Sequence, residues 1–290
     1  MQLRSCRLVA CPVGPSPPFR PCPRCSAMLL AQLSDPHVDR TRPHKAAALR
    51  RAVAFVATLP QPPDAVLITG DCTDHGHPDE YDEFEAALEP LPMPVFVVPG
   101  NHDDRAELLS RRPPPGEACE SFMQYVVENF PLRLIGLDTQ WPGHGGGELC
   151  AQRLAWLDEV LSQAPARPTL LFMHHPPVQT GLQVLDDIGL RGHAEFCAVV
   201  AHHPQVVRVV AGHVHLPLTA SFAHTTVMTC PGTDATFQPA WAQPDKLVIQ
   251  YQPPLALLHR WTAEGGLTSF TAVPEAAPWV TLHDGQRWAD

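Results

Sequence analysis

Short apolar runs alternate with amphipathic stretches along the first three quarters of this 290-residue chain. The apolar runs predict buried strands at residues 29–33, 65–69, 95–98, 132–137, 169–173 and 206–210. The amphipathic stretches between them predict helices at residues 45–59, 80–88, 154–161 and 194–201. This repeated order of strand, loop and helix predicts an α/β fold.

The helical pattern fades after residue 215, where four shorter apolar segments follow. We expect these segments to be strands that complete a sandwich of two sheets. They cover residues 218–222, 225–229, 247–252 and 255–261.

The N-terminal segment, residues 1–27, differs in composition from the rest of the chain. It contains four cysteines, six prolines and four arginines but no acidic residue, and such a segment cannot bury much of a core. We expect a disordered or non-native extension, with Met28 as the functional start. A zinc site that uses Cys22 and Cys25, or a transit peptide, are the alternatives. We assign residues 28–273 to the main domain and residues 274–290 to a C-terminal tail.

Composition and charge narrow the classes of function. Hydrophobic residues make up 44% of the chain, and its net charge is -10, with 20 basic against 30 acidic residues. Nucleic-acid binding over a broad surface needs a surplus of Lys and Arg, which is missing. No apolar run reaches the length of about 18 residues that suits a membrane span, and the nine cysteines suggest no disulfide framework. We therefore expect a cytoplasmic enzyme without nucleic-acid or membrane partners.

Candidate metal-binding residues follow the predicted strands at their carboxyl ends, where groups from distant parts of an α/β chain converge. The clusters are Asp35-Pro36-His37, Gly70-Asp71, Gly100-Asn101-His102-Asp103, His174-His175 and Gly212-His213-Val214-His215. Carboxylate, amide and imidazole ligands without thiolate suit divalent cations that catalyse hydrolysis. The clusters supply ligands for two metal ions and predict a metallohydrolase.

Each cluster also has an ordinary structural explanation when it is taken alone. An aspartate after a strand can form a turn, and asparagine tolerates left-handed backbone. Of the neighbours His174 and His175, one is expected to be structural, because adjacent side chains in a strand point to opposite sides. His213 and His215 are two residues apart and face the same side. The recurrence at five strand ends favours the metal site.

The motifs D-x-H, G-D-x-x-D, G-N-H-D and G-H-x-H, with a histidine after a strand, resemble the calcineurin-like metallophosphoesterase superfamily over about residues 29–216. This resemblance implies a four-layer α/β/β/α sandwich of two mixed sheets flanked by helices. The segment His174-His175-Pro176-Pro177, residues 185–190 and residues 253–261 are similar to class III cyclic-nucleotide phosphodiesterases and glycerophosphodiesterases. Protein serine/threonine phosphatases fit worse, since they carry arginine at the position of His75.

The resemblance implies seven metal ligands and one catalytic histidine. The first metal would be held by Asp35, His37, Asp71 and His215. The second would be held by Asp71, Asn101, His174 and His213. A shared Asp71 reduces the repulsion between cations about 3.5 to 4 Å apart. His102 would protonate or stabilise the leaving oxygen while a metal-bridging hydroxide attacks phosphorus, or it would orient a ligand or the phosphate instead.

The expected function is hydrolysis of a small phosphodiester, foremost a 3',5'-cyclic nucleotide, with two divalent or mixed-valence ions drawn from Fe, Mn, Zn and Co. A glycerophosphodiesterase is the alternative. A catalytically inactive binding scaffold is a more distant alternative. Such a scaffold would be expected to have lost metal ligands, whereas all seven ligand positions are filled here. The superfamily forms dimers and larger assemblies, so a homo-oligomer stays open. The substrate-binding residues, the physiological substrate and the metal pair are not identified by these motifs.

Overall fold

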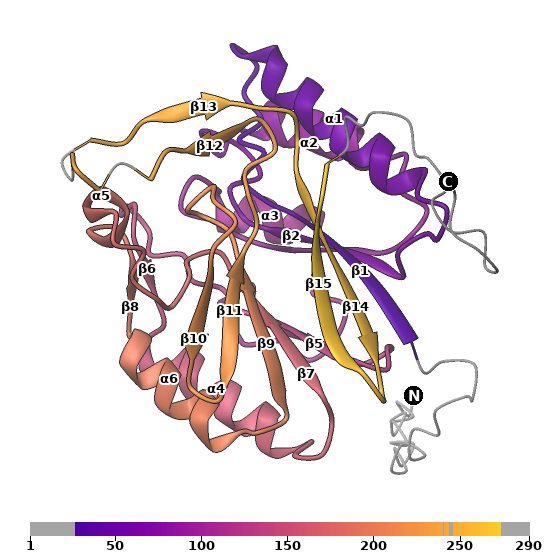
Figure 1. Ribbon diagram of the computed structural model, residues 1–290, viewed down its shortest axis with the longest axis vertical. Helices are drawn as coiled ribbons and strands as arrows, with labels where there is room; N and C mark the ends of the chain where they lie inside the picture. The colour runs from indigo at the N-terminus through magenta and orange to yellow at the C-terminus, as the bar shows by residue number, and fades with distance from the viewer. Residues whose placement is uncertain (1–26, 240, 244–245, 274–290) are drawn as a thin grey trace, which may run out of the picture.

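The computed structural model describes residues 27–239, 241–243 and 246–273. Two β-sheets face each other in the centre of the molecule, and helices cover their outer faces (Figure 1). Both sheets contain parallel and antiparallel strand pairs. The expected α/β/β/α sandwich of two mixed sheets is therefore confirmed.

The first sheet has five strands, of which the three that precede candidate ligands are parallel. Its order is β15 (Gly266–Ala272), β14 (Ala256–Thr262), β1 (Ala27–Leu33), β2 (Ala65–Thr69) and β3 (Val95–Val98). Helices α1 (Pro43–Ala57) and α2 (Pro78–Leu88) lie against it. Each begins with a proline, whose fixed φ and missing N–H suit the first helical turn.

The second sheet has six strands with a parallel centre and an antiparallel strand at each edge. Its order is β10 (Thr219–Phe222), β11 (Thr225–Thr229), β9 (Val206–Ala211), β7 (Thr169–Phe172), β5 (Arg133–Gly136) and β4 (Tyr125–Val127). Helices α4 (Ala151–Ser162) and α6 (His193–His202) pack on its outer face. The parallel strands β9 and β7 end beside those of the first sheet.

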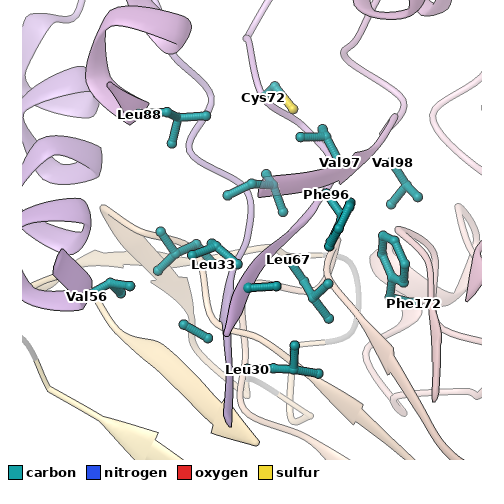
Figure 2. Close-up of a cluster of buried hydrophobic side chains, with 14 of the residues drawn as sticks. Leu30, Leu33, Val56, Leu67, Cys72, Leu88, Phe96, Val97, Val98 and Phe172 are labelled. Carbon is teal, nitrogen blue, oxygen red and sulfur yellow. The ribbon is translucent and has the colours of Figure 1, made fainter. Parts of the chain in front are cut away.

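Apolar side chains alternate between the two faces of the first sheet and fill the layers on both sides of it. In Figure 2, Leu33 of β1 lies on the side of Val56 from α1, whereas Leu67 of β2 lies on the side of Phe172 from the second sheet. These four side chains are fully buried. This packing holds the ends of the strands from both sheets in fixed relative positions.

Several short elements lie outside the two main sheets. They are α3 (Arg105–Arg111), β6 (Gly147–Glu148), α5 (Gln183–Asp186), β8 (Leu190–Arg191), β12 (Ala235–Phe237) and β13 (Ile249–Tyr251). The prediction that residues 247–252 join the sandwich is wrong, because β13 pairs only with β12. A sandwich strand buries one face, but all three residues of β13 are exposed.

Three further predictions concern the ends of the chain, the cysteines and membrane-spanning helices. Ala27, which we assigned to the extension, is already part of β1 and pairs with Thr262. The predictions for residues 1–26 and for the tail 274–290 lie outside the described residues. Within the described ranges the five cysteines are all free, and no helix there has the length and apolar character that a membrane crossing requires.

Candidate metal centre

The structure brings all seven predicted ligand residues and His102 to one edge of the sandwich. They sit on the segments that follow five parallel strands, β1, β2 and β3 of the first sheet and β7 and β9 of the second. The residues are Asp35, His37, Asp71, Asn101, His102, His174, His213 and His215. Groups separated by up to 180 positions in the chain therefore face one another, as carboxyl ends of parallel strands do.

Main-chain hydrogen bonds continue the β1–β2 pairing into the ligand segments. The N–H of Asp35 donates to the carbonyl of Gly70 at 3.1 Å, and the N–H of His37 donates to the carbonyl of Asp71 at 2.9 Å. The glycines before the ligands allow close approach, since a Cβ on Gly100 would lie 2.1 Å from Oδ1 of Asp71. The backbone itself therefore positions these side chains.

Left-handed backbone is concentrated in the ligand residues. In the described part of the chain seven non-glycine residues have positive φ, and five of the seven are candidate ligands. Their φ angles are 50° for Asp35, 44° for His37, 50° for Asp71, 69° for His213 and 50° for His215. Such conformations are uncommon outside glycine and cluster at functional sites. The surrounding fold therefore holds these ligands in positions that relaxed loops would not adopt.

The first group of ligands surrounds Nε2 of His37. That atom lies 3.1 Å from Nε2 of His215 and 3.4 Å from Oδ2 of Asp71. Nε2 of His215 lies 3.4 Å from Oδ1 of Asp35. Two ring nitrogens and two carboxylate oxygens that could bind a metal thus lie close together, and they come from three different segments.

The second group surrounds Nε2 of His174. It lies 3.1 Å from Oδ1 of Asn101 and 3.4 Å from the same Oδ2 of Asp71 that faces His37. The ring of His213 is 5.1 Å from that of His174, measured between centroids. Asp71 therefore lies between the two groups.

Hydrogen bonds on the outer nitrogens fix which ring nitrogen faces inward. Nδ1 of His174 donates to the carbonyl of Thr69 at 2.7 Å, and Nε2 of His213 donates to the carbonyl of Ile188 at 3.1 Å. Nδ1 of His37 faces Oδ1 of Asp74 at 3.0 Å. Because carbonyls only accept, Nε2 of His174 and Nδ1 of His213 are the nitrogens that carry the lone pair when the rings are neutral, which is the form that binds a metal.

The site concentrates charge that needs compensation. Burial raises the pKa of Asp35 to about 6. Burial also opposes ionisation of Asp71, but His174 and His37 hold the pKa of its carboxyl well below the usual range. Burial and the neighbouring His174 lower the pKa of His213 to about 3. Burial opposes protonation of His174, but Asp71 raises the pKa of its ring to about 9, so a bound cation would take the place of this proton. Two buried carboxylates among imidazoles form a donor set that divalent cations fit.

The cysteine nearest these ligands takes no part in this donor set. The Cys72 side chain points into the hydrophobic core (Figure 2), and burial raises the pKa of its thiol well above the usual value. Oxygen and imidazole donors without thiolate suit Fe, Mn, Zn or Co.

His102 lies at the edge of the site and is exposed. Its main-chain N–H donates to Oδ1 of Asp71 at 2.9 Å, and its Nδ1 donates to the carbonyl of Asp74 at 2.8 Å. Its ring contacts that of His37 edge to face, with centroids 4.7 Å apart. Nε2 is therefore the ring nitrogen left for an incoming molecule.

The neighbour of His174 has its ring nitrogens engaged elsewhere. Nδ1 of His175 accepts from the hydroxyl of Thr139 at 2.9 Å, and Nε2 donates to the carbonyl of Gly145 at 3.3 Å. Both nitrogens of His175 thus hold the loops beside the site. Nε2 of His174, in contrast, faces Asp71 and Asn101.

Some residues that support the site were missed by the motif analysis. Nε2 of Gln140 donates to the carbonyl of Gly100 at 3.1 Å and to that of Asp103, on either side of Asn101 and His102. The buried carboxylate of Asp138 accepts from Arg105 and from the N–H of Gln140. The only signal in the sequence is the position of Asp138 and Gln140 just after a strand.

A cavity of about 290 Å³ opens above the ligands. One wall carries the cations Arg42 and Lys45. The apolar part of the lining comes from α5, from Ile188, from the β12–β13 ribbon and from Leu247 beside it. The apolar side chains are Leu185, Ile188, Phe237, Leu247, Ile249 and Tyr251.

Comparison with solved structures bears on the fold. A dimetal phosphatase from Danio rerio superposes with a TM-score of 0.64 at 18% identity, over 86% of this chain and 99% of that one. At this identity the match shows that the two proteins share a fold.

Comparison with known sequences bears on the family. A probable glycerophosphodiester phosphodiesterase of Arcobacter nitrofigilis is 34% identical over 84% of this chain and 93% of its own length. A probable cyclic nucleotide phosphodiesterase of a Synechococcus species is 36% identical over 72% of this chain and 81% of its own. The model for calcineurin-like phosphoesterases matches residues 28–217. The predictions of a metallophosphoesterase and of a phosphoric diester hydrolase are confirmed, and the chain belongs to the calcineurin-like phosphoesterase family.

Proposed function

We propose that this protein is a dinuclear metal-dependent phosphodiesterase whose substrate is a 3',5'-cyclic nucleotide. The observation that carries the proposal is the convergence of carboxylate, amide and imidazole groups from both sheets beneath one cavity. The first metal is assigned to Asp35, His37, Asp71 and His215. The second metal is assigned to Asp71, Asn101, His174 and His213.

The chemistry that bound metals supply at such a centre is a lowered pKa of water and neutralisation of the charge on phosphoryl oxygens. The protein residues bind and orient the diester. Arg42 and Lys45 line the cavity but are paired with Asp39 and Asp74, so the positive charge that attracts an anionic diester would come chiefly from the bound metals.

His102 is assigned the role of general acid. Its Nδ1–H is held by the carbonyl of Asp74, so the proton that it can give is on Nε2. When the bond from phosphorus to the leaving oxygen breaks, that oxygen keeps the electron pair and takes this proton. The imidazolium becomes neutral imidazole, which the Asp74 carbonyl continues to orient.

The apolar part of the cavity lining supports a cyclic nucleotide as the substrate. Phe237, Ile249 and Tyr251 offer aromatic and aliphatic surface to the organic group of the diester. A nucleobase can stack on such surface, whereas glycerol and ethanolamine offer little apolar area. The second candidate is a glycerophosphodiester, supported by relatives of that name from Arcobacter nitrofigilis and Enterobacter lignolyticus. A homo-oligomer and a cytoplasmic location stay predictions.

The test compares three substrates with metal-loaded protein: bis(p-nitrophenyl) phosphate, 3',5'-cyclic AMP and glycerophosphoethanolamine. We expect turnover of the first and a kcat/KM for cyclic AMP at least about tenfold above that for glycerophosphoethanolamine, a difference of about 1.4 kcal/mol. The reverse order would establish the alternative substrate. No turnover of any of the three would contradict the proposed hydrolase.

The ligand assignment is tested with Asn101→Ala, which removes one amide ligand of the second metal. We expect the variant to bind one metal ion per chain in place of two and to lose hydrolysis of bis(p-nitrophenyl) phosphate at least about a hundredfold, since both metals act on the phosphoryl group. Metal analysis after gel filtration measures the first quantity. Full activity with two metals bound would refute the assignment.

A further inference from the structure

Gln32 is a fully buried polar residue in the interface between the two sheets. Its Nε2 donates two hydrogen bonds, to Oγ1 of Thr69 at 3.0 Å and to the carbonyl of Ala211 at 3.0 Å. Its Oε1 accepts from Nε2 of His259 at 3.0 Å. Because the Ala211 carbonyl only accepts, the orientation of the amide is determined, and both of its N–H groups are used.

The partners of Gln32 stand directly before candidate metal ligands. Thr69 of β2 is followed by Gly70 and Asp71, and its carbonyl accepts from Nδ1 of His174. Ala211 of β9 is followed by Gly212 and His213. Gln32 itself precedes Asp35 by three residues in β1. One side chain thus joins the ligand-bearing strands β1 and β2 of the first sheet to β9 of the second.

Other hydrogen bonds also join the sheets near the ligands, such as those from His174 to the Thr69 carbonyl and from the His213 N–H to Asp35, but they involve the candidate ligands themselves. Gln32 differs because it binds no metal in this assignment. Around Gln32 the sheets meet through apolar side chains such as Leu30, Leu67 and Phe172. Apolar packing is non-directional and tolerates small shifts, whereas a buried amide with three hydrogen bonds allows few arrangements.

A second pair of residues holds Gln32 in place. Nε2 of His259 in β14 must carry its proton in order to donate to Gln32, so Nδ1 accepts from the hydroxyl of Ser269 in β15 at 2.8 Å. Burial lowers the pKa of His259 to about 3, which keeps this ring neutral. Hydrogen bonds thus run in one direction from Ser269 through His259 and Gln32 to Ala211.

We propose that Gln32 is a positioning residue that sets the spacing between the two halves of the metal centre. This inference rests on the proposed dinuclear function. In this assignment each metal takes ligands from both sheets, so a slip of one sheet against the other changes the ligand geometry at both metal positions and the distance between them. Gln32 connects the sheets at the point where such a slip would matter most.

The experiment compares Gln32→Leu, which removes the three hydrogen bonds at similar volume, with Leu30→Ala in the same strand and the same buried layer. Each protein is loaded with Mn²⁺. The readouts are metal content, the electron paramagnetic resonance signal of the exchange-coupled pair, and kcat and KM for bis(p-nitrophenyl) phosphate. Exchange coupling depends on the distance and bridging between the two ions, so a change in stability alone does not alter it.

We expect Gln32→Leu to bind two ions with an altered coupling and a kcat lowered about tenfold to a hundredfold, the usual effect of losing a residue behind the ligands. Leu30→Ala should lower the melting temperature but keep the wild-type coupling. If Gln32→Leu does not fold, Thr69→Val removes one of its acceptors and should change the coupling in the same direction by less.

Two outcomes would overturn the inference: an unchanged coupling and kcat in Gln32→Leu, or the same altered coupling in Leu30→Ala. Failure of the proposed function looks different. In that case the wild-type protein itself would bind fewer than two ions per chain or show no coupled signal.

Discussion

The candidate metal centre and the β12–β13 ribbon line the same cavity but are built in opposite ways. The ligands follow strands of two buried sheets, and main-chain hydrogen bonds hold them. The ribbon pairs only with itself, and its residues Ile249 and Tyr251 are 48% and 64% exposed. The candidate ligands therefore sit on the rigid part of the fold, whereas the proposed substrate contacts come from a part with few packing neighbours. The two parts should therefore respond differently to mutation.

The largest effect is expected for Asp71→Asn in the metal centre. The substitution removes the charge that both ligand groups face, so we expect loss of both metals and at least about a thousandfold lower kcat, as for removal of a central electrostatic group. Metal analysis and hydrolysis of bis(p-nitrophenyl) phosphate measure the two effects. Glu120→Gln, which neutralises an exposed acid, is the matched control and should retain both properties. A variant with two metals and near wild-type kcat would remove Asp71 from its bridging role.

A smaller and more selective effect is expected for Tyr251→Ala in the ribbon. Loss of one aromatic contact to a base costs about 1 to 3 kcal/mol, so kcat/KM for cyclic AMP should fall about tenfold or more. Metal content and kcat for bis(p-nitrophenyl) phosphate should change less than twofold. Trp241→Ala serves as the control, because Trp241 is 66% exposed and does not line the cavity over the metals. An equal loss for both substrates would show that the ribbon supports the centre and does not select substrate.

The third effect concerns stability and not catalysis: it is the dependence of the sheet interface on pH, and it is small for each pH unit. The pKa of His259 is lowered by burial from 6.5 to about 3. Above pH 6.5 the ring is neutral in both states. As the pH falls from 6.5 toward 3, only the unfolded chain takes up the proton, so the free energy of unfolding falls by up to about 1.4 kcal/mol per pH unit.

Urea unfolding of the metal-free protein at several pH values measures this slope. Buried Asp35 titrates in the same range. The wild-type slope is therefore compared with that of His259→Gln, which keeps the contribution of Asp35 and lacks that of His259. The difference between the two slopes isolates the histidine. Parallel slopes would mean that His259 is not excluded from protonation in the folded state.

The convergence of the candidate ligands was easier to predict from the sequence than the residues around them. Asp35, Asp71 and His213 follow apolar runs that mark strand ends, and this signal is local in the chain. Gln32 gave no such signal, because its partners Ala211 and His259 lie 179 and 227 positions away. A single polar residue in an apolar run does not reveal which strand will lie opposite.

The ribbon shows a second limit of pattern analysis. Residues 247–252 have the apolar character of a strand, and a strand does form at Ile249–Tyr251. The pattern reports only the tendency of a segment to be extended, not whether another layer covers it. Segments α3 and β4 were missed because seven and three residues are too few to establish a period.

The left-handed backbone of the five ligand residues has a consequence for how this enzyme can lose its function. Conformations of this kind cost about 1 to 3 kcal/mol each, and five of them are comparable with the whole stability of an ordinary domain, about 5 to 15 kcal/mol. Metal binding to the folded state offsets this cost. A descendant no longer selected for catalysis would gain stability by replacing these residues with glycine. Selection for stability of the folded state would then remove the ligand residues faster than random drift.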